Sequence, residues 1–275
     1  MDDRQTKTTM KERRHQRAKE ANNRLGETIL QNCGEIAFIV EYRNAKDITI
    51  QFKNSGELVE CAYGNFKKGV IKSHFTPTIY GFGVVGLDKT IDKNGKHLKS
   101  YNVWSSMIQR CYSKKFHLKY PTYKDCSVCG EWLFYPNFKE WFDENYYEID
   151  NYKMTLDKDI LIKGNKVYSP NTCVFVPERI NLLFTKKDAN RGKLPIGVYW
   201  NETKNKYQAN CSIFDITTNK SKGKNLGYYN TPEEAYQSYK KEKENNIKQV
   251  ADYYKDQIPS KLHEAMYRYE VEIAD

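Results

Sequence analysis

Two aspartates that flank a lysine are the first candidates for chemistry in this sequence. Asp157, Lys158 and Asp159 lie in residues 154–161, which we interpret as a strand. Because side chains alternate along a strand, the two aspartates would share one face, where their carboxylates could hold Mg²⁺. Lys158 is normally protonated and cannot act as a base unless it is strongly desolvated, but it could neutralise developing charge. The alternative interpretation is an ordinary acidic strand in a protein that only binds.

A second candidate is a group of cysteines. Cys126 and Cys129 have the two-residue spacing of a zinc knuckle, and Cys111 and Cys173 fall in the same predicted module. Four thiolates could close a tetrahedral structural Zn²⁺ site, and buried structural thiols are the alternative. The seven cysteines are an odd number in a chain without a secretory signal, so a disulfide framework is not expected.

A third candidate is a polar face near the carboxyl end. In residues 207–213 the apolar positions alternate with Gln208, Asn210 and Ser212, which would point away from the core of a strand. Strands are also predicted at residues 196–200 and 224–229. The pattern Thr-Pro-Glu-Glu at 231–234 then predicts a helix that begins with a capping box and a proline in its first turn. The expected unit is a three-stranded antiparallel sheet packed on one helix.

The charge of the chain favours a polyanionic partner. The 45 Lys and Arg residues exceed the 35 Asp and Glu residues by 10, and residues 191–227 hold seven basic residues against two acidic ones. Neutralising phosphates releases counterions, so basic patches of this kind suit nucleic acid, although solubility alone is the alternative reason for such charge.

The amino terminus and the hydropathy place the expected protein away from membranes. Residues 1–10 open with two acidic side chains and lack an apolar core, which is not the pattern of a secretory signal. The longest apolar run, residues 36–40, is far too short to span a bilayer. We therefore expect a soluble protein of the cytoplasm with no membrane partner.

The predicted fold class is α+β with a modular organisation. Short strands rich in β-branched and aromatic residues between residues 36 and 63 predict a small, strongly bent barrel. Further along, a strand, a loop, a strand at 172–176 and a helix at 177–184 follow one another. The predicted modules are a basic arm at 1–32, the small β-barrel at 33–76, a module of helices and a ββα unit at 77–190, the sheet-and-helix unit at 191–254, and a tail or helix at 255–275.

The carboxyl-terminal unit resembles a known DNA-binding family. GVYW, KYQANCSI and LGYYNTPEEAYQSY look like the plant Apetala/ethylene-response-factor (ERF) domain and its relatives in phage homing endonucleases. In that family the exposed face of the sheet enters the major groove of double-stranded DNA while the helix packs behind it. This chain replaces most of the family's Arg and Trp readers, so base preference does not transfer. The resemblance implies that DNA is contacted by Arg191, Tyr199, Asn201, Lys204, Lys206, Gln208, Asn210, Ser212, Lys222, Lys224 and Asn225, the lysines holding phosphates.

The middle of the chain is similar to a phage family of HNH endonucleases. The residues that carry this similarity are Trp104, Met107, Arg110 to Tyr112, Tyr123, Cys126, Cys129, Trp132, Leu156 to Asp159, Tyr168 to Pro170, Thr172, Cys173, Phe175, Val176 and Asn181. In that superfamily a ββα unit holds one divalent metal, a histidine activates water, and an asparagine, here Asn181, positions the histidine. This chain has Lys158 where most members have histidine, which puts catalysis in doubt.

Three functions remain open at this point. The first is a homing-type endonuclease, or a descendant that has lost cleavage, bound to duplex DNA in a bacterial cell. The second is a regulator that binds DNA without being an enzyme. The third is a phage factor that uses the same surfaces to block a host nuclease or another host protein.

Overall fold

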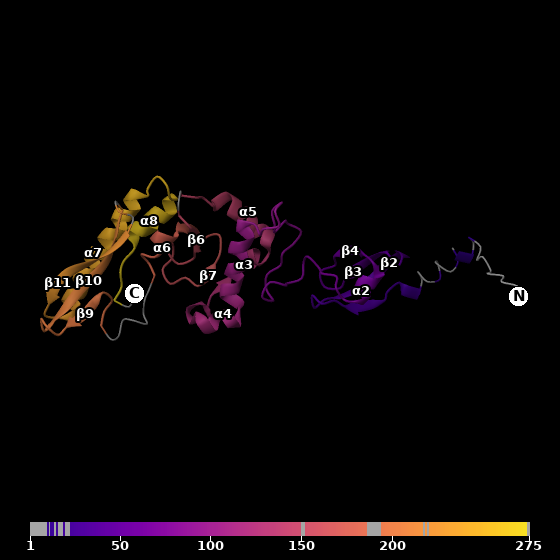
Figure 1. Cartoon of the computed structure of the whole chain (residues 1–275), viewed down its shortest axis with the longest axis horizontal. Coiled ribbons are helices and arrows are strands. Elements are labelled where there is room, and N and C mark those ends of the chain that lie inside the picture. The colour runs from indigo at the N-terminus through magenta and orange to yellow at the C-terminus, as the bar shows by residue number, and fades with distance from the viewer. Residues whose placement is uncertain are drawn as a thin grey trace. The chain divides into compact units, whose positions relative to one another are not determined.

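In the computed structural model the described residues are 23–149, 152–185, 194–216 and 220–273, with six single positions. Those positions are Met10, Glu12, Arg13, His15, Lys19 and Thr218. Most of the predicted basic arm therefore lies outside the described residues. The chain divides into two compact units, residues 1–140 and 141–275, in a mixed α+β fold (Figure 1). Among the described residues, the helices lack an apolar run of the length needed to traverse a bilayer.

The first unit begins with an antiparallel sheet of strands in the order β1-β2-β3-β4. They are β1 (Thr28–Leu30), β2 (Ile36–Asn44), β3 (Asp47–Phe52) and β4 (Leu58–Cys61), followed by helix α2 (Tyr63–Lys67).

This first sheet is open, so the predicted small barrel is wrong in its closure. Strands β1 and β4 are the two edges, and each is only three or four residues long. Phe66 of α2 is fully buried against Ile39, Ile48 and Phe52. The helix thus covers the apolar face, and the sheet buries its core without joining its edges.

The rest of the first unit packs around aromatic side chains. Its elements are α3 (Lys99–Tyr112), α4 (Lys114–Lys119), η1 (Pro121–Tyr123), β5 (Ser127–Val128), η2 (Gly130–Leu133) and the first part of α5 (Tyr135–Asn145). Trp104 and Trp132 are almost completely buried, and the indole nitrogen of Trp104 donates to the carbonyl of Trp132 at 2.7 Å. The buried face of α3, which also includes Met107, Ile108 and Cys111, therefore belongs to the core of this unit.

The second unit contains the predicted strand–loop–strand–helix order. Strand β6 (Met154–Asp157) pairs directly and antiparallel with β8 (Val174–Pro177), and α6 (Glu178–Asn181) follows β8. The short β7 (Val167–Tyr168) lies between β6 and β8 in the sequence but is not part of their sheet. The predicted continuation of the first strand to residue 161 is wrong. A carboxylate oxygen of Asp157 accepts hydrogen bonds from the backbone N–H groups of Asp159 and Ile160, which turns the chain at the end of β6.

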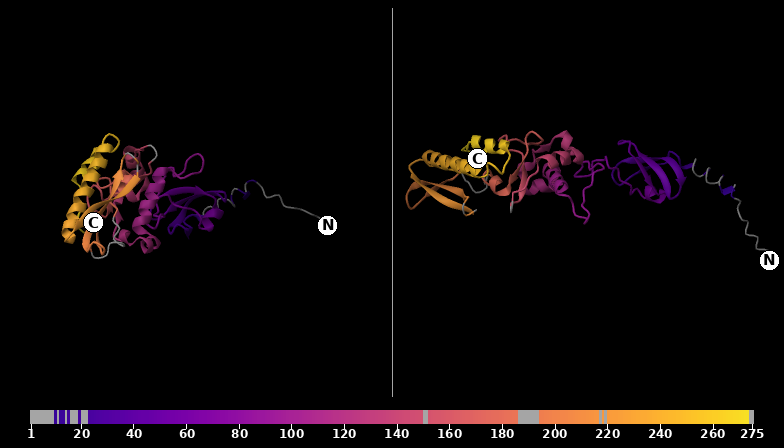
Figure 2. Two further views of the ribbon diagram at one scale, coloured as in Figure 1. Left: turned by 60° about the vertical axis from the view of Figure 1, so that its left-hand side comes forward. Right: turned by 90° about the horizontal axis from the view of Figure 1, so that it is seen from above.

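The predicted three-stranded sheet and its helix are both present. Strands β9 (Val198–Asn201), β10 (Lys206–Asp215) and β11 (Lys220–Tyr229) are antiparallel in the order β11-β10-β9. Helix α7 (Pro232–Tyr253) runs along one face of this sheet (Figure 2) and begins with the predicted capping box between Thr231 and Glu234.

One hydrophobic cluster crosses the module boundary predicted near residue 190. Val176 and Ile180 of the β6–β8–α6 unit share this cluster with Phe214 of β10 and Ile247 of α7. Helix α8 (Ser260–Arg268) adds Leu262 and Met266 to it. The ββα unit and the three-stranded sheet consequently fold around a common core.

Candidate nucleic-acid interface

The face of the three-stranded sheet that points away from α7 is polar and partly exposed along β9 and the first part of β10. Residues opposite each other in an antiparallel pair share a face, so Tyr199 of β9, Gln208 of β10 and Tyr228 of β11 form one cross-strand row. Tyr199 is 53% exposed and Tyr228 is 40% exposed. On the opposite face Ala209 and Cys211 are buried against α7, as the alternation predicted. We call the side facing away from α7 the outward face.

Amide side chains form a ladder across this outward face. The Asn201 amide nitrogen donates to the Gln208 carbonyl oxygen at 3.0 Å, and the Gln208 amide nitrogen donates to the Asn210 oxygen at 3.2 Å. The Asn201 oxygen also accepts from the backbone N–H of Lys204 at 2.9 Å. These contacts orient the amides, and no described residue accepts a hydrogen bond from the Asn210 amide N–H groups at the end of the ladder.

The β11 edge of the outward face contains a bulge that the sequence pattern did not reveal. Pairing shifts between Ala209 and Asn210, because Leu226 has no partner in β10. Asn225 accepts from the backbone N–H of Gly227 at 3.0 Å, and its amide donates to the Tyr228 hydroxyl at 3.4 Å. The shift leaves Asn225 opposite Asn210 and brings Tyr228, which the sequence reasoning had missed, onto the outward face.

The predicted phosphate-binding lysines divide between two faces. Lys206 pairs with Asn201 on the outward face, and Lys204 is exposed in the turn before β10. Lys222 and Lys224 lie opposite Ile213 and Cys211, which places them on the α7 side. The Lys224 ammonium is also ion-paired with Glu242 of α7 at 2.8 Å. Ser212 is exposed on the outward face, and Arg191 lies outside the described residues.

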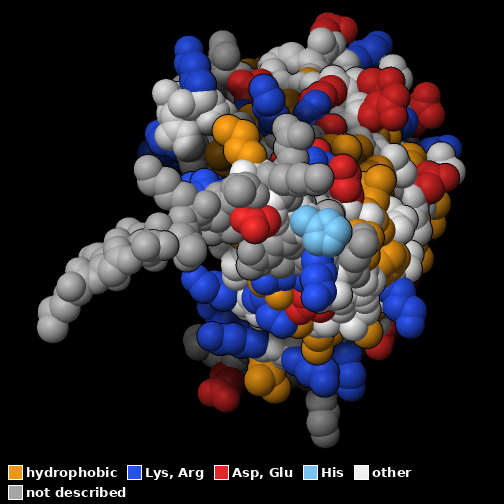
Figure 3. Space-filling view, turned by 90° about the vertical axis from the view of Figure 1, so that its right-hand side faces the viewer, with side chains coloured by type: hydrophobic (Ala, Val, Ile, Leu, Met, Phe, Trp, Pro, Cys, Tyr) orange, Lys and Arg blue, Asp and Glu red, His pale blue; other side chains and the backbone are white. Residues whose placement is uncertain are grey.

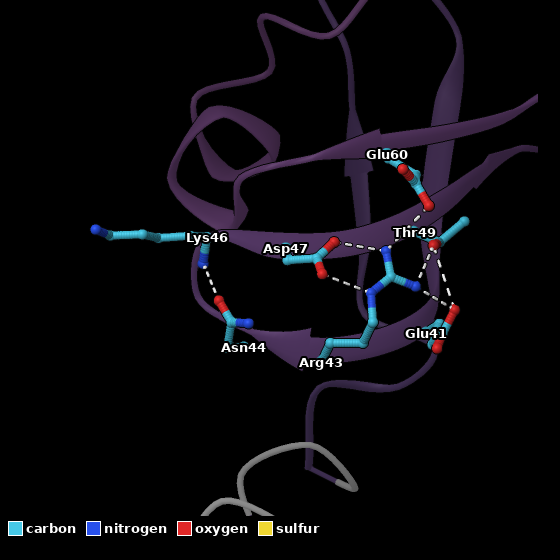
Figure 4. A network of polar contacts seen from close by, with 7 residues as sticks. All are labelled: Glu41, Arg43, Asn44, Lys46, Asp47, Thr49 and Glu60. Carbon is cyan, nitrogen blue, oxygen red and sulfur yellow. Dashed lines mark hydrogen bonds and ion pairs between the residues drawn. The ribbon is translucent and has the colours of Figure 1, made fainter.

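The exposed face of the first sheet differs in charge. The Arg43 guanidinium is surrounded by the carboxylates of Glu41, Asp47 and Glu60 and by the Thr49 hydroxyl (Figure 4). These carboxylates, Asp47 above all, raise the pKa of Arg43. Three carboxylates around one cation give this face a negative balance that would repel phosphates. In the three-stranded sheet the one strand carboxylate is Asp215 at the end of β10, and its register with Cys211 and Ile213 places it on the α7 side.

Surface charge alone does not single out a binding face. The side of the molecule drawn in Figure 3 shows Lys and Arg side chains interspersed with acidic and hydrophobic ones. The difference in charge between the exposed faces of the two sheets therefore indicates a nucleic-acid-binding face better than the net charge of the chain does.

Asp157 is held at the end of β6 in an environment that favours its protonated form. Burial, together with the negative charge of Asp159 beside it, raises the pKa of Asp157 to about 6. The structure therefore brings the two aspartates together, but through the turn that ends β6 rather than through strand alternation. A carboxylate of this pKa can exchange a proton near neutral pH.

Lys158 is a structural side chain in this fold. It is only 7% exposed, and its ammonium donates to Asp159 at 2.9 Å and to the backbone carbonyl of Asn165 at 3.0 Å. The Asn165 amide donates back to the Lys158 carbonyl at 2.7 Å. These bonds fasten the loop between β6 and β7. Asn181 ends α6, and among the described residues no hydrogen bond joins its side chain to Asp157.

The predicted zinc ligands occupy both units. Cys111 and Cys126 are buried in the first unit, Cys129 is half-buried there, and Cys173 is buried in the second unit. Burial raises the pKa of Cys129, which favours the thiol over the thiolate that binds zinc. Within the described parts of the chain, no three His, Cys, Asp or Glu side chains are grouped so that they could hold a metal ion. The zinc site stays a prediction.

Comparisons of the chain with protein-family models, with curated proteins and with solved structures found no significant match.

The raised pKa of Asp157 predicts a pH-dependent effect of Asp157→Asn on stability. An aspartate in an unfolded chain has a pKa of about 4. Between about pH 4 and pH 6 Asp157 is therefore protonated mainly in the folded state. The free energy of unfolding consequently falls as the pH rises through that window. Asparagine removes this loss and can still accept the two backbone hydrogen bonds. We therefore compare the free energy of unfolding of the variant with that of the wild type at each pH. The variant's advantage over the wild type should be larger at pH 8 than at pH 4, by on the order of 2 kcal/mol.

Urea unfolding at the two pH values measures this difference. Asp256→Asn, at an exposed position of the same unit, is the control and should show no such pH dependence. An equal effect of Asp157→Asn at both pH values would contradict the assignment.

The zinc prediction is tested by metal analysis of the purified full-length protein. We expect about one zinc per chain, and we expect Cys126→Ser combined with Cys129→Ser to lower both the zinc content and the unfolding temperature. Identical zinc content and stability in the wild type and the double variant would reject a structural zinc site.

Proposed function

We propose that the protein binds double-stranded DNA through the outward face of its three-stranded sheet. The observation that carries the proposal is the aligned amide ladder of Asn201, Gln208 and Asn210 on a face with exposed tyrosines and no strand carboxylate. Asparagine and glutamine amides match the donor and acceptor pairs that adenine presents in the major groove.

The dimensions and charge of this face support the same partner. The major groove is about 12 Å wide and admits a narrow β-sheet or ribbon. Lys204 and Lys206 lie at the end of the sheet where β9 turns into β10, so they can contact phosphates while the amides of Gln208 and Asn210 reach base edges. The resemblance to the ERF domain implies the same docking, and the carboxylate-rich face of the first sheet is unsuited to it.

Lys206 and Lys222 form a matched pair for testing the docking face. Each is an exposed lysine of the same sheet, but they lie on opposite faces. Lys206→Ala should weaken duplex binding roughly three- to tenfold at low salt and make the slope of log affinity against log salt concentration shallower by about one. Lys222→Ala should leave both nearly unchanged. Fluorescence anisotropy with a labelled duplex measures both quantities.

Two outcomes would reject this docking. Equal losses in the two lysine variants would show non-specific attraction by the whole surface. If the wild type binds no duplex even in dilute buffer and forms a stable complex with a host protein instead, the host-inhibitor function replaces the DNA-binding one.

A second candidate function is metal-dependent cleavage of the bound DNA. Asp157, with a pKa of about 6, lies beside Asp159 at the end of the first strand of a ββα unit. The two carboxylates are the residues that would hold Mg²⁺, which would stabilise charge on the phosphate. Lys158, at the position of the usual histidine base, is buried and hydrogen-bonded to Asp159 and Asn165, so this position supplies no histidine base.

Cleavage is tested by incubating supercoiled plasmid with the protein and Mg²⁺ or Mn²⁺. If the protein is a nuclease, we expect nicking that requires the divalent ion, disappears in Asp157→Asn and persists in Asp256→Asn. Tight, salt-sensitive duplex binding by the wild type without nicking would identify a DNA-binding regulator that is not an enzyme.

A further inference from the structure

A cleft of about 930 Å³ opens beside the outward face, within the second unit. Asn210 and Ser212 of β10 line one side of it, Glu178 and Arg179 of α6 line another, and Lys243 of α7 also lies in its wall. Ligand sites typically measure about 300 to 1,000 Å³, so this cleft has room for a nucleotide.

The cleft exists because β9 is much shorter than β10. The pairing of β9 ends at Ala209, so the following part of β10 has no strand beside it on that edge. Asn246 of α7 satisfies this edge at Phe214, accepting from its N–H at 3.0 Å and donating to its carbonyl at 3.1 Å. The Phe214 ring lines the cleft, and the Arg179 guanidinium lies 6.0 Å from its centre.

The charge inside the cleft is positive. Its lining includes three cations, Arg179, Lys220 and Lys243, and a single carboxylate among the described residues, Glu178. The Glu178 carboxylate is already ion-paired with Lys153 at 2.9 Å. Among the described lining residues, the three cations therefore outnumber the single carboxylate.

Lys243 is the cation whose position most needs an anion. Its side chain is half-buried, and desolvation lowers the pKa of its ammonium. Among the described residues no carboxylate lies within ion-pair distance of it, whereas its neighbour on α7, Lys240, is paired with Glu244 at 2.9 Å. A bound anion would restore the electrostatic stabilisation that burial takes from Lys243.

We propose that this cleft binds the phosphate group of a nucleotide, with the Lys243 ammonium as the main contact to the anion and Arg179 and Lys220 beside it. The exposed ring of Tyr199 in the lining of the cleft offers a surface on which a base can stack, and the Asn210 amide offers hydrogen bonds. The nucleotide could belong to a DNA strand held on the outward face, a source that rests on the proposed function, or it could be free in solution.

Titration calorimetry of the full-length protein with dAMP, and with deoxyadenosine as the ligand without phosphate, tests the cleft. Lys243→Met keeps the length of the side chain but removes its charge, and Lys248→Met is the matched control at an exposed position of α7. If the free nucleotide is the source, Lys243→Met should weaken dAMP binding by at least about tenfold, as expected for losing one charge-assisted hydrogen bond. Deoxyadenosine should bind weakly to all three proteins.

Duplex binding by the same variants distinguishes the strand as the source. A comparable loss of duplex affinity in Lys243→Met, with Lys248→Met unchanged, places a nucleotide of the DNA in the cleft. The unfolding temperature of Lys243→Met should be no lower than that of the wild type, because a half-buried ammonium no longer has to be desolvated. A loss of binding without a loss of stability therefore identifies a ligand contact.

The proposal is overturned if Lys243→Met binds both dAMP and duplex as the wild type does, or if the wild type binds neither. The two proposals can fail independently. If the wild type binds dAMP through Lys243 but binds no duplex, the nucleotide site in the cleft is supported and the docking of DNA on the outward face is rejected. Duplex binding that depends on Lys206 but not on Lys243, without dAMP binding, keeps the docking and rejects the cleft.

Discussion

Burial of both ends of helix α7 is the constraint on which the second unit depends. The first turns of α7 pack Ala235, Tyr236 and Tyr239 against the three-stranded sheet, and its last turns pack Ile247 and Val250 into the cluster shared with β8 and α6. A helix of 22 residues cannot leave this much apolar surface in water, so the sheet and the ββα unit must both be present to cover it.

The close approach of the sheet to α7 also decides which face is free. Gly197 has a φ of +74°, and a Cβ atom at this position would lie 2.1 Å from the Tyr239 ring. Glycine therefore lets the chain enter β9 directly on the helix. Because α7 covers one face of the sheet, the polar residues on the other face are not covered by this helix. Strand β9 is short, so the later part of β10 has no neighbouring strand on that edge and lines the cleft.

The region around Asp157 shows how one sequence pattern can carry two roles. Asp157 caps the turn after β6 through two backbone hydrogen bonds, and Lys158 fastens the next loop. Both side chains thus contribute to local structure at the position where a nuclease would have its catalytic groups. The pKa of Asp157 is nevertheless raised by the same burial that fixes its position, which keeps proton transfer chemically accessible.

The sequence by itself determined the local elements of the second unit. Alternation in β10 predicted that Gln208, Asn210 and Ser212 point outward, and the Thr231–Glu234 pattern predicted the capping box of α7, because both depend on neighbours within a few residues.

Only the tertiary structure decided which residues from distant segments come together. The bulge at Leu226 set the faces of Tyr228, Lys222 and Lys224, and α2 covered the first sheet so that no barrel closed. The ion pair of Lys224 with Glu242 and the half-buried position of Lys243 likewise arise from packing between elements. Such contacts depend on register and on burial against remote side chains, which the spacing of residues along a chain does not encode.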